Sequence, residues 1–192
     1  MNYNLYFEME NKIIYLQNDI KLINLKEDDG KMFLEGYACH FDKANLNSQI
    51  VNAKSFNTYF DLLKKNAISK AIMNWEHNLD KQIGAIDTIT TDEDGLFIEA
   101  HLNTEIPFVA DWLVPNIKAN DLTGLSTEGY VYGGLNGIIM NEDGSYYVKD
   151  MILTAVALTN NPADVEARFS LANAVNEWNL ENAVKKSKWY FL

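Results

Sequence analysis

The sequence predicts a mainly antiparallel β-sheet or β-barrel with a few helices. Three acidic turns of similar composition each lie between two apolar runs, which is the pattern of β-hairpins. These turns are Glu27–Gly30, Asp92–Gly95 and Asn141–Gly144. Because strands follow strands through short turns, without a helix between them, a parallel α/β sheet is not expected.

The apolar runs on either side of these turns give the expected strands. They cover Lys12–Leu25, Met32–Phe41, Ile83–Thr91, Leu96–Leu102, Gly137–Met140 and Tyr146–Leu158. The dense acidic residues offer a second interpretation, in which the turns bind calcium. The EF-hand alternation of ligands, with a glutamate at the twelfth position, is missing from all three turns, so hairpins are preferred.

Helices are predicted at three places. Ser55 is a candidate cap for a helix from about Phe56 to Lys65, where aromatic residues recur at helical spacing. Pro107 is expected to open a second helix, which Pro115 should kink or end. A third is expected from Asp164 through about Trp178, and in broken form to Lys188. The aromatic residues of the first two helices are interpreted as core.

Length and composition indicate one globular domain. The chain has 192 residues, of which 47% are hydrophobic. We expect a lead-in over residues 1–11, a barrel domain over 12–172 and a C-terminal helical tail over 173–192. The formal net charge of -11 argues against nucleic-acid binding and against an acidic membrane surface. The single cysteine excludes an internal disulfide, and neither a secretion signal nor a membrane-spanning run is evident.

Ser126 is the candidate nucleophile. It lies between Gly124 and Gly129, at the start of an aromatic and β-branched run. A serine needs a nearby base to react at neutral pH, and the chain offers only His40, His77 and His101. The alternative is a turn serine that bonds locally to the backbone, since the Gly-x-Ser-x-Gly elbow is not matched strictly.

His77 is the candidate base, because it lies where a strand passes into a loop. The alternative is a polar loop histidine without a role. Zinc is not expected, because Glu76-His77 lacks the second histidine of a His-Glu-x-x-His motif.

Further along the chain, a predicted buried strand runs into an Asn-Asn-Pro turn. The backbone amides of Asn160 and Asn161 are therefore candidates to bind an oxyanion, although a plain strand end explains the same pattern.

Taken in order, these segments resemble the prohead protease family of tailed bacteriophages. The matching segments are Gly36–Ala38 with Phe41-Asp42, Ile50-Val51 with Phe56, Trp75–Asn78 with Ile83-Gly84, Asp92–Leu96, Gly124–Ser126 with Glu128–Tyr130, and Val156–Ala163. Each motif is weak alone, but six in the family order, over about residues 33–170, make the resemblance specific.

The resemblance implies a fold similar to herpesvirus assemblins: a closed or partly closed antiparallel β-barrel ringed by helices. It implies a maturation serine protease with Ser126 as nucleophile and His77 as base, without a metal or other cofactor. The substrates would be the scaffold and major capsid proteins, and often the protease itself. It would act inside the assembling procapsid in the host cytoplasm, or in a bacterial cytoplasm if encoded by a prophage. A homodimer is expected by analogy.

The sequence departs from the family pattern at Ala155, where relatives carry a residue that orients the histidine. Glu128, Asp150 and Asp164 are the nearest acids that could substitute, and the alternatives are a Ser–His dyad without a third member or a loss of activity. A second hypothesis is a catalytically inactive protein that keeps the protease fold and has a structural or scaffold-binding role. A third is a ligand-binding barrel, in which Trp75 and Trp112 would line an open groove.

Overall fold

The computed structural model describes residues 14–23, 27–28, 30–119, 121–122, 124–160 and 171–172. The main sheet contains β1 (Ile14–Ile23), β2 (Glu27–Asp28), β3 (Lys31–His40), β5 (Ile72–Trp75), β6 (Asn78–Thr91), β7 (Gly95–Asn103), β8 (Gly124–Val131), β11 (Met151–Thr159) and β12 (Leu171–Ala172). A smaller sheet contains β4 (Gln49–Ile50), β9 (Ile138–Met140) and β10 (Tyr146–Val148). The helices are η1 (Ala53–Phe56), α2 (Asn57–Lys64), η2 (Val109–Leu113), α3 (Val114–Lys118) and η3 (Gly134–Gly137).

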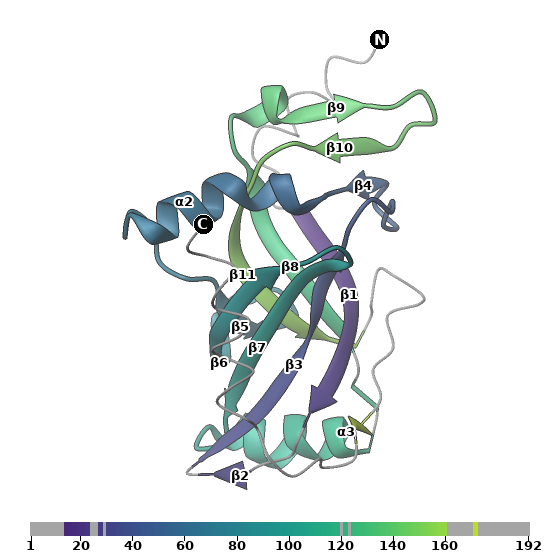
Figure 1. Cartoon of the computed structure of the whole chain (residues 1–192). Helices are drawn as coiled ribbons and strands as arrows, with labels where there is room; N and C mark the ends of the chain where they lie inside the picture. The colour runs from purple at the N-terminus through teal and green to yellow at the C-terminus, as the bar shows by residue number, and fades with distance from the viewer. Residues whose placement is uncertain are drawn as a thin grey trace.

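Six strands form a curled sheet in the order β8-β11-β5-β6-β7-β3, which is a half-barrel open along one side (Figure 1). β1 lies along this opening and pairs with β8 on one side and with β3 on the other. The predicted fold class, mainly β with helices, is confirmed. The six-stranded sheet is open rather than closed, and its β5–β11 pair is parallel rather than antiparallel.

The three predicted hairpins are present. β6 pairs with β7 and β9 with β10 across the second and third acidic turns, and β1 pairs with β3 on the two sides of the first. Two residues of the first turn, Glu27 and Asp28, form β2, which pairs with the start of β3. The run that was expected to form one strand after the third turn forms two, because β10 ends at Val148 and joins the small sheet while β11 begins at Met151. The predicted third helix is wrong at Leu171 and Ala172, which pair with β1 as β12. The rest of that helix lies outside the described residues.

Burial along the strands follows their position in the sheet. β3 and β7 alternate between buried and more exposed residues, as expected for strands with one face on the core. β8 is buried at six consecutive residues and β11 at eight of nine, so both faces of these two strands are covered. They form the wall of the half-barrel that carries Ser126.

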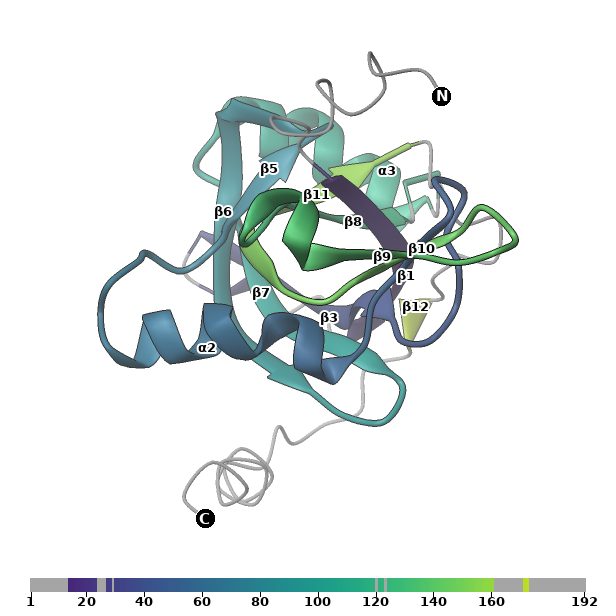
Figure 2. The ribbon, with the colours of Figure 1, turned by 90° about the horizontal axis from the view of Figure 1, so that it is seen from above.

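Helical segments and the small sheet lie at the ends and side of the half-barrel (Figures 1 and 2). The small sheet lies above one end, α2 runs beside that end, and α3 lies at the other. The first predicted helix begins with η1, which is capped by Asn52 rather than by Ser55; the Ser55 hydroxyl completes the capping box. Pro115 does not end the second helix. It lies in the first turn of α3, directly after the π-helical segment η2, and the helix continues through it to Lys118.

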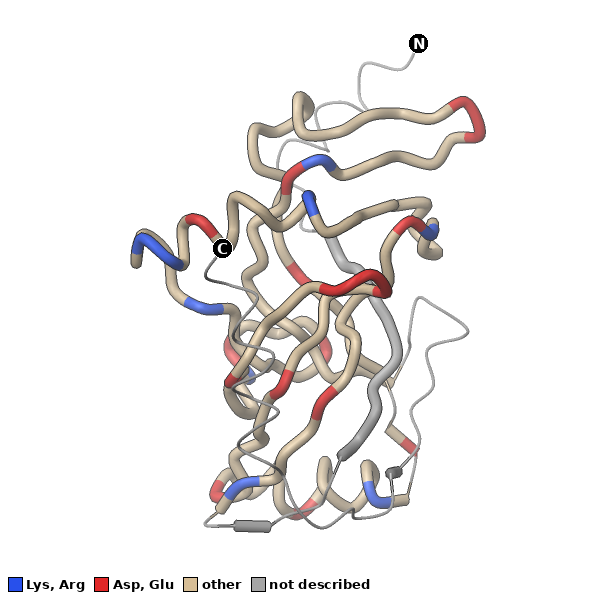
Figure 3. Tube along the Cα trace, in the orientation of Figure 1, with Lys and Arg blue, Asp and Glu red and all other residues tan. Residues whose placement is uncertain are grey.

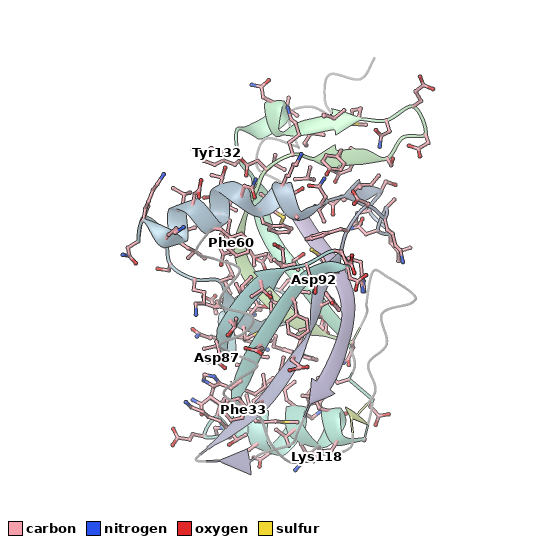
Figure 4. The ribbon with its side chains drawn as sticks, in the orientation of Figure 1. Phe33, Phe60, Asp87, Asp92, Lys118 and Tyr132 are labelled. Carbon is pink, nitrogen blue, oxygen red and sulfur yellow. The ribbon has the colours of Figure 1, made fainter. Side chains whose placement is uncertain are left out.

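Charged residues gather at several turns and helix ends. Figure 3 shows acidic residues grouped at the tip of the β9–β10 hairpin and at the turn between β6 and β7, and basic residues at the ends of α2 and α3. Figure 4 locates Asp92 at the β6–β7 turn, where its carboxylate accepts a 2.8 Å hydrogen bond from Tyr37. In the part of the chain that the structure describes, no helix is long and apolar enough to span a membrane.

Candidate active site

Strands β8, β11 and β5 lie side by side and set the register of the site. Ser126 on β8 pairs with Ala157 on β11, which in turn pairs with Asn74 on β5. Because side chains alternate along a strand, Ser126 and Glu128 project from the same face of β8. Leu125 and Leu158 project from the opposite face, where they belong to the hydrophobic core. The candidate site therefore lies on the face of the sheet turned away from the core.

Gly129 permits the close contact between β8 and β11. A Cβ atom there would lie 2.3 Å from the carbonyl oxygen of Ile152, closer than two such atoms can approach. The glycine after Glu128 is therefore required by the close packing of the two strands.

Ser126 is nearly fully buried, with 1% of its surface exposed. Its Oγ atom is also buried and has no hydrogen-bond partner among the described residues. Most buried hydroxyl groups bond to a carbonyl or to another side chain, so an unpaired one is unusual. The alternative of a turn serine bonded to its local backbone does not fit this geometry. The Ser126 hydroxyl is therefore not hydrogen-bonded to His77 in this structure, and its proton remains available to a base.

His77 lies in the two-residue turn between β5 and β6, where Trp75 pairs with Asn78. Its Nδ1 atom is 3.4 Å from the Oε2 atom of Glu128. The histidine side chain is 20% exposed and that of Glu128 is 1% exposed. Burial lowers the pKa of His77 below its ordinary value, while the negative charges of Glu128 and Glu76 oppose this shift. The imidazole is therefore held in its neutral form at pH 7, as a general base requires.

The contact with Glu128 also decides which ring nitrogen can reach a substrate or a serine. With Nδ1 facing the carboxylate, the proton is placed on Nδ1 and the lone pair on Nε2. Of the three acids that the sequence offered, Glu128 is the one in contact with His77. Asp150 accepts a hydrogen bond from Thr58 and precedes the first residue of β11, at the other end of that strand from Leu158. Asp164 lies outside the described residues.

Asn74 contacts the same carboxylate. Its Nδ2 atom lies 3.4 Å from Glu128 Oε2, and the residue is fully buried. Its Oδ1 atom has no hydrogen-bond partner among the described residues. The buried polar group thus comprises Ser126, Glu128 and Asn74, with His77 at its edge. The amide donor of Asn74 and the imidazole together keep the buried carboxylate hydrogen-bonded.

Of the two backbone amides predicted to bind an oxyanion, the structure describes only that of Asn160. The amide of Asn160 donates a 2.7 Å hydrogen bond to Oε1 of Glu76, so it is already engaged by a carboxylate. An oxyanion could bind there only after Glu76 had moved away. Asn161 lies outside the described residues.

The other two histidines lie elsewhere. His101 contacts both carboxylate oxygens of Asp87, each at 2.9 Å, across the β6–β7 pair. It also lines a hollow of about 540 Å³ together with Gly30, Lys31, Gln82, Gly84, Ala85, Asn103, Glu105 and Ile106. No serine lines this hollow, so it is not the candidate active site. His40 is at the end of β3 and packs against Tyr37. The described residues contain no cluster of side chains suited to a metal ion.

The sequence did not single out Asn74 or Glu76 for a role. Both lie in the segment Asn74–Asn78, but nothing in their type distinguished them from ordinary polar residues. The one available signal was the turn itself. Glu76 and His77 are the two central residues of this hairpin turn, and both have positive φ. Hairpin turns with positive φ at both central residues favour the sequence Asn-Gly.

The fold is a curled β-sheet in which the buried Ser126 lies two residues from Glu128, the acid that contacts His77. A model of the caudovirus prohead serine protease family matches residues 19–181. The chain therefore belongs to the caudovirus prohead serine protease family.

The fold is also similar to that of the bacteriophage T4 capsid assembly protease gp21. The two share 15% sequence identity with a TM-score of 0.57, and the match covers 79% of this chain and 100% of that one. A comparison with curated protein sequences gives no match.

Proposed function

We propose that this protein is a serine endopeptidase that cleaves scaffold protein, capsid protein or both during phage procapsid maturation. Membership of the prohead protease family and the fold shared with a capsid assembly protease support the class of function. The contact of His77 with Glu128, two residues from Ser126 on one strand, carries the assignment of the site. The protease would act inside the assembling capsid.

In the proposed mechanism, Ser126 attacks the carbonyl carbon of the scissile peptide bond. As the Oγ–carbon bond forms, the proton of Oγ passes to Nε2 of His77, and the carbonyl oxygen takes the negative charge. His77 then gives that proton to the leaving amine as the carbon–nitrogen bond breaks. Water repeats the sequence to hydrolyse the acyl-enzyme and restore Ser126.

Glu128 is proposed as the third member of the site, in place of the residue missing at Ala155. Its carboxylate would accept the Nδ1 proton of His77 and stabilise the imidazolium formed during attack. The oxyanion would be bound by backbone amides after β11. The amide of Asn161 is the preferred candidate, because Glu76 engages that of Asn160. The proposal needs neither a metal nor another cofactor. A herpesvirus assemblin-type barrel and a homodimer remain predictions.

The burial of Ser126 supports a second candidate function. With 1% of its surface exposed, Ser126 is reached by a peptide only if the protein opens at this face. A catalytically inactive member of the family, with a structural or scaffold-binding role in capsid assembly, would not need such an opening. The ligand-binding barrel is not retained: Trp75 and Trp112 do contact each other, with ring centroids 5.2 Å apart, but neither lines the hollow beside His101.

Co-expression with the scaffold and capsid proteins of the same phage, followed by mass spectrometry of the products, distinguishes the two candidates. The endopeptidase proposal predicts new termini in the scaffold or capsid protein, and their loss in Ser126→Ala. Uncleaved partners with the unaltered chain, or the same products with Ser126→Ala, would contradict it.

A further inference from the structure

The turn that carries His77 has an unusual backbone. Glu76 has a φ of 50° and His77 a φ of 57°, and both are flanked by the paired residues Trp75 and Asn78. Positive φ at both central residues is the requirement of a type I′ hairpin turn, for which Asn-Gly is the favoured sequence. Glutamate is disfavoured in this region because its Cβ crowds the backbone. The surrounding structure must therefore hold this turn in place.

Glu76 is held through three hydrogen bonds to the end of β11. Its amide donates to the carbonyl oxygen of Leu158 at 3.0 Å. Its carboxylate accepts one bond from the Thr159 hydroxyl at 3.0 Å and another from the Asn160 amide at 2.7 Å. Three consecutive residues of one segment therefore bind the backbone and both carboxylate oxygens of Glu76. We call this set of bonds the Glu76 clamp.

The clamp connects the histidine turn to β11, the strand that pairs with the serine strand β8. The end of β11 pairs with the start of β8 through Leu158 with Leu125 and Thr159 with Gly124. Fixing Glu76 on this segment fixes the adjacent His77 relative to β8.

We propose that Glu76 is a positioning residue, whose clamp on Leu158, Thr159 and Asn160 holds His77 in line with Ser126 and Glu128. This inference rests on the proposed protease function and deepens it. Glu76 does not touch the reacting atoms. It acts through the backbone of His77, and a displacement of the base by about 1 Å can cost a hundredfold in rate.

Substitutions at Glu76 separate the clamp from two simpler explanations. Glu76→Gln keeps an oxygen for the Asn160 amide and places an NH₂ group beside the Thr159 hydroxyl, so it removes the charge but not the clamp. Glu76→Asn adopts positive φ more readily than glutamate but is one methylene shorter, so it favours the turn and loses the clamp. Glu76→Ala loses both the clamp and the charge. Thr159→Val and Thr159→Ser form a matched pair that removes or keeps the hydroxyl donor.

The measurement is the rate at which a fluorophosphonate, which phosphorylates activated serines, labels the purified full chain across pH. We expect Glu76→Gln to retain most of the rate and Thr159→Ser to exceed Thr159→Val. Glu76→Asn and Glu76→Ala should each fall by about tenfold to a hundredfold. A Glu76→Asn rate equal to that of the unaltered chain would overturn the proposal, because the turn conformation alone would then suffice.

A second measurement does not depend on reactivity. In the Ser126→Ala chain, NMR titration follows the His77 ring, with His40 and His101 as references. Losing only the Glu76 charge in Glu76→Gln should lower the pKa of His77, because that charge raises it. Losing the clamp in Glu76→Asn should instead expose the ring and raise its pKa toward the ordinary value.

Shifts of the same sign in both variants would contradict the clamp. The two proposals can fail separately. If Ser126→Ala is labelled as fast as the unaltered chain, the protease proposal is wrong. The NMR titration still decides whether Glu76 positions His77.

Discussion

The Nδ1 atom of His77 lies 3.4 Å from the Oε2 atom of Glu128, although 51 positions separate the two residues in the sequence. Glu128 stands two residues after Ser126 on β8, so the proposed nucleophile and the acid that contacts the proposed base share one strand. The sequence resemblance places the family's histidine-orienting residue at Ala155 on the neighbouring strand β11, which pairs directly with Glu128.

The first prediction concerns this carboxylate. Glu128→Gln removes the charge that would stabilise an imidazolium, so we expect Ser126 reactivity to fall by about a hundredfold or more. Because the Glu128 charge raises the pKa of His77 while burial lowers it, the variant should have a still lower pKa. The residual reactivity should therefore persist to lower pH. Fluorophosphonate labelling between pH 4 and pH 9 measures both effects, with the exposed Glu93→Gln as control. An unchanged rate would remove Glu128 from the site.

The second prediction reverses the sign of that pH effect. Asn74→Asp places a second carboxylate beside Glu128, where Asn74 Nδ2 now lies 3.4 Å from Oε2. Additional negative charge near His77 favours its protonated form and raises its pKa. The lower pH limit of labelling should then move upward. Asn74→Ala, which adds no charge, is the matched control, and a downward shift in Asn74→Asp would contradict the assigned arrangement.

The third prediction uses the other histidines as controls. His101 forms the shorter contact with a carboxylate, at 2.9 Å from Asp87, and would be preferred as a base on distance alone. It lies beside a hollow without a lining serine, however, whereas His77 contacts the strand of Ser126. We expect His77→Ala to lose at least about a hundredfold in scaffold cleavage. His101→Ala and His40→Ala should remain within a few-fold. Loss of cleavage in His101→Ala with a folded chain would relocate the base.

The fourth prediction concerns the packing that sets the site. Gly129→Ala would place a methyl group 2.3 Å from the Ile152 carbonyl oxygen, forcing β8 and β11 apart. We expect a loss of about 1–3 kcal/mol in the free energy of unfolding, together with loss of Ser126 reactivity. Gly134→Ala is the matched control: nothing lies within 4 Å of its added methyl group, and its positive φ should cost about 1 kcal/mol without affecting the site. Equal losses of reactivity in both variants would contradict the packing argument.

Much of the fold could be predicted from local sequence patterns. The three acidic turns gave the three hairpins because their composition specifies a tight turn between alternating strands. The division between β10 and β11 was missed, because an apolar run does not reveal that Val148 belongs to one sheet and Met151 to another. Pro115 was expected to limit a helix, but the π-helical segment before it accommodates the missing amide donor.

The residue types of the candidate site could be proposed from the sequence, but the contacts between them could not. Ser126 and His77 were selected as residue types suited to acyl transfer, and Glu128 was one of three acids close in sequence. Which acid meets the imidazole depends on the long-range register of β5, β11 and β8, which no local pattern encodes. The engagement of the Asn160 amide by Glu76 depends on the same register and was likewise not anticipated.

The most direct test of the account is to locate the adduct after fluorophosphonate treatment of the purified full chain. Peptide mapping by mass spectrometry should find one phosphonylated residue, Ser126, and the adduct should disappear in Ser126→Ala and decline strongly in His77→Ala. A chain that remains unlabelled after prolonged treatment, or that carries the adduct on another residue, would contradict the assignment of Ser126 as an activated nucleophile.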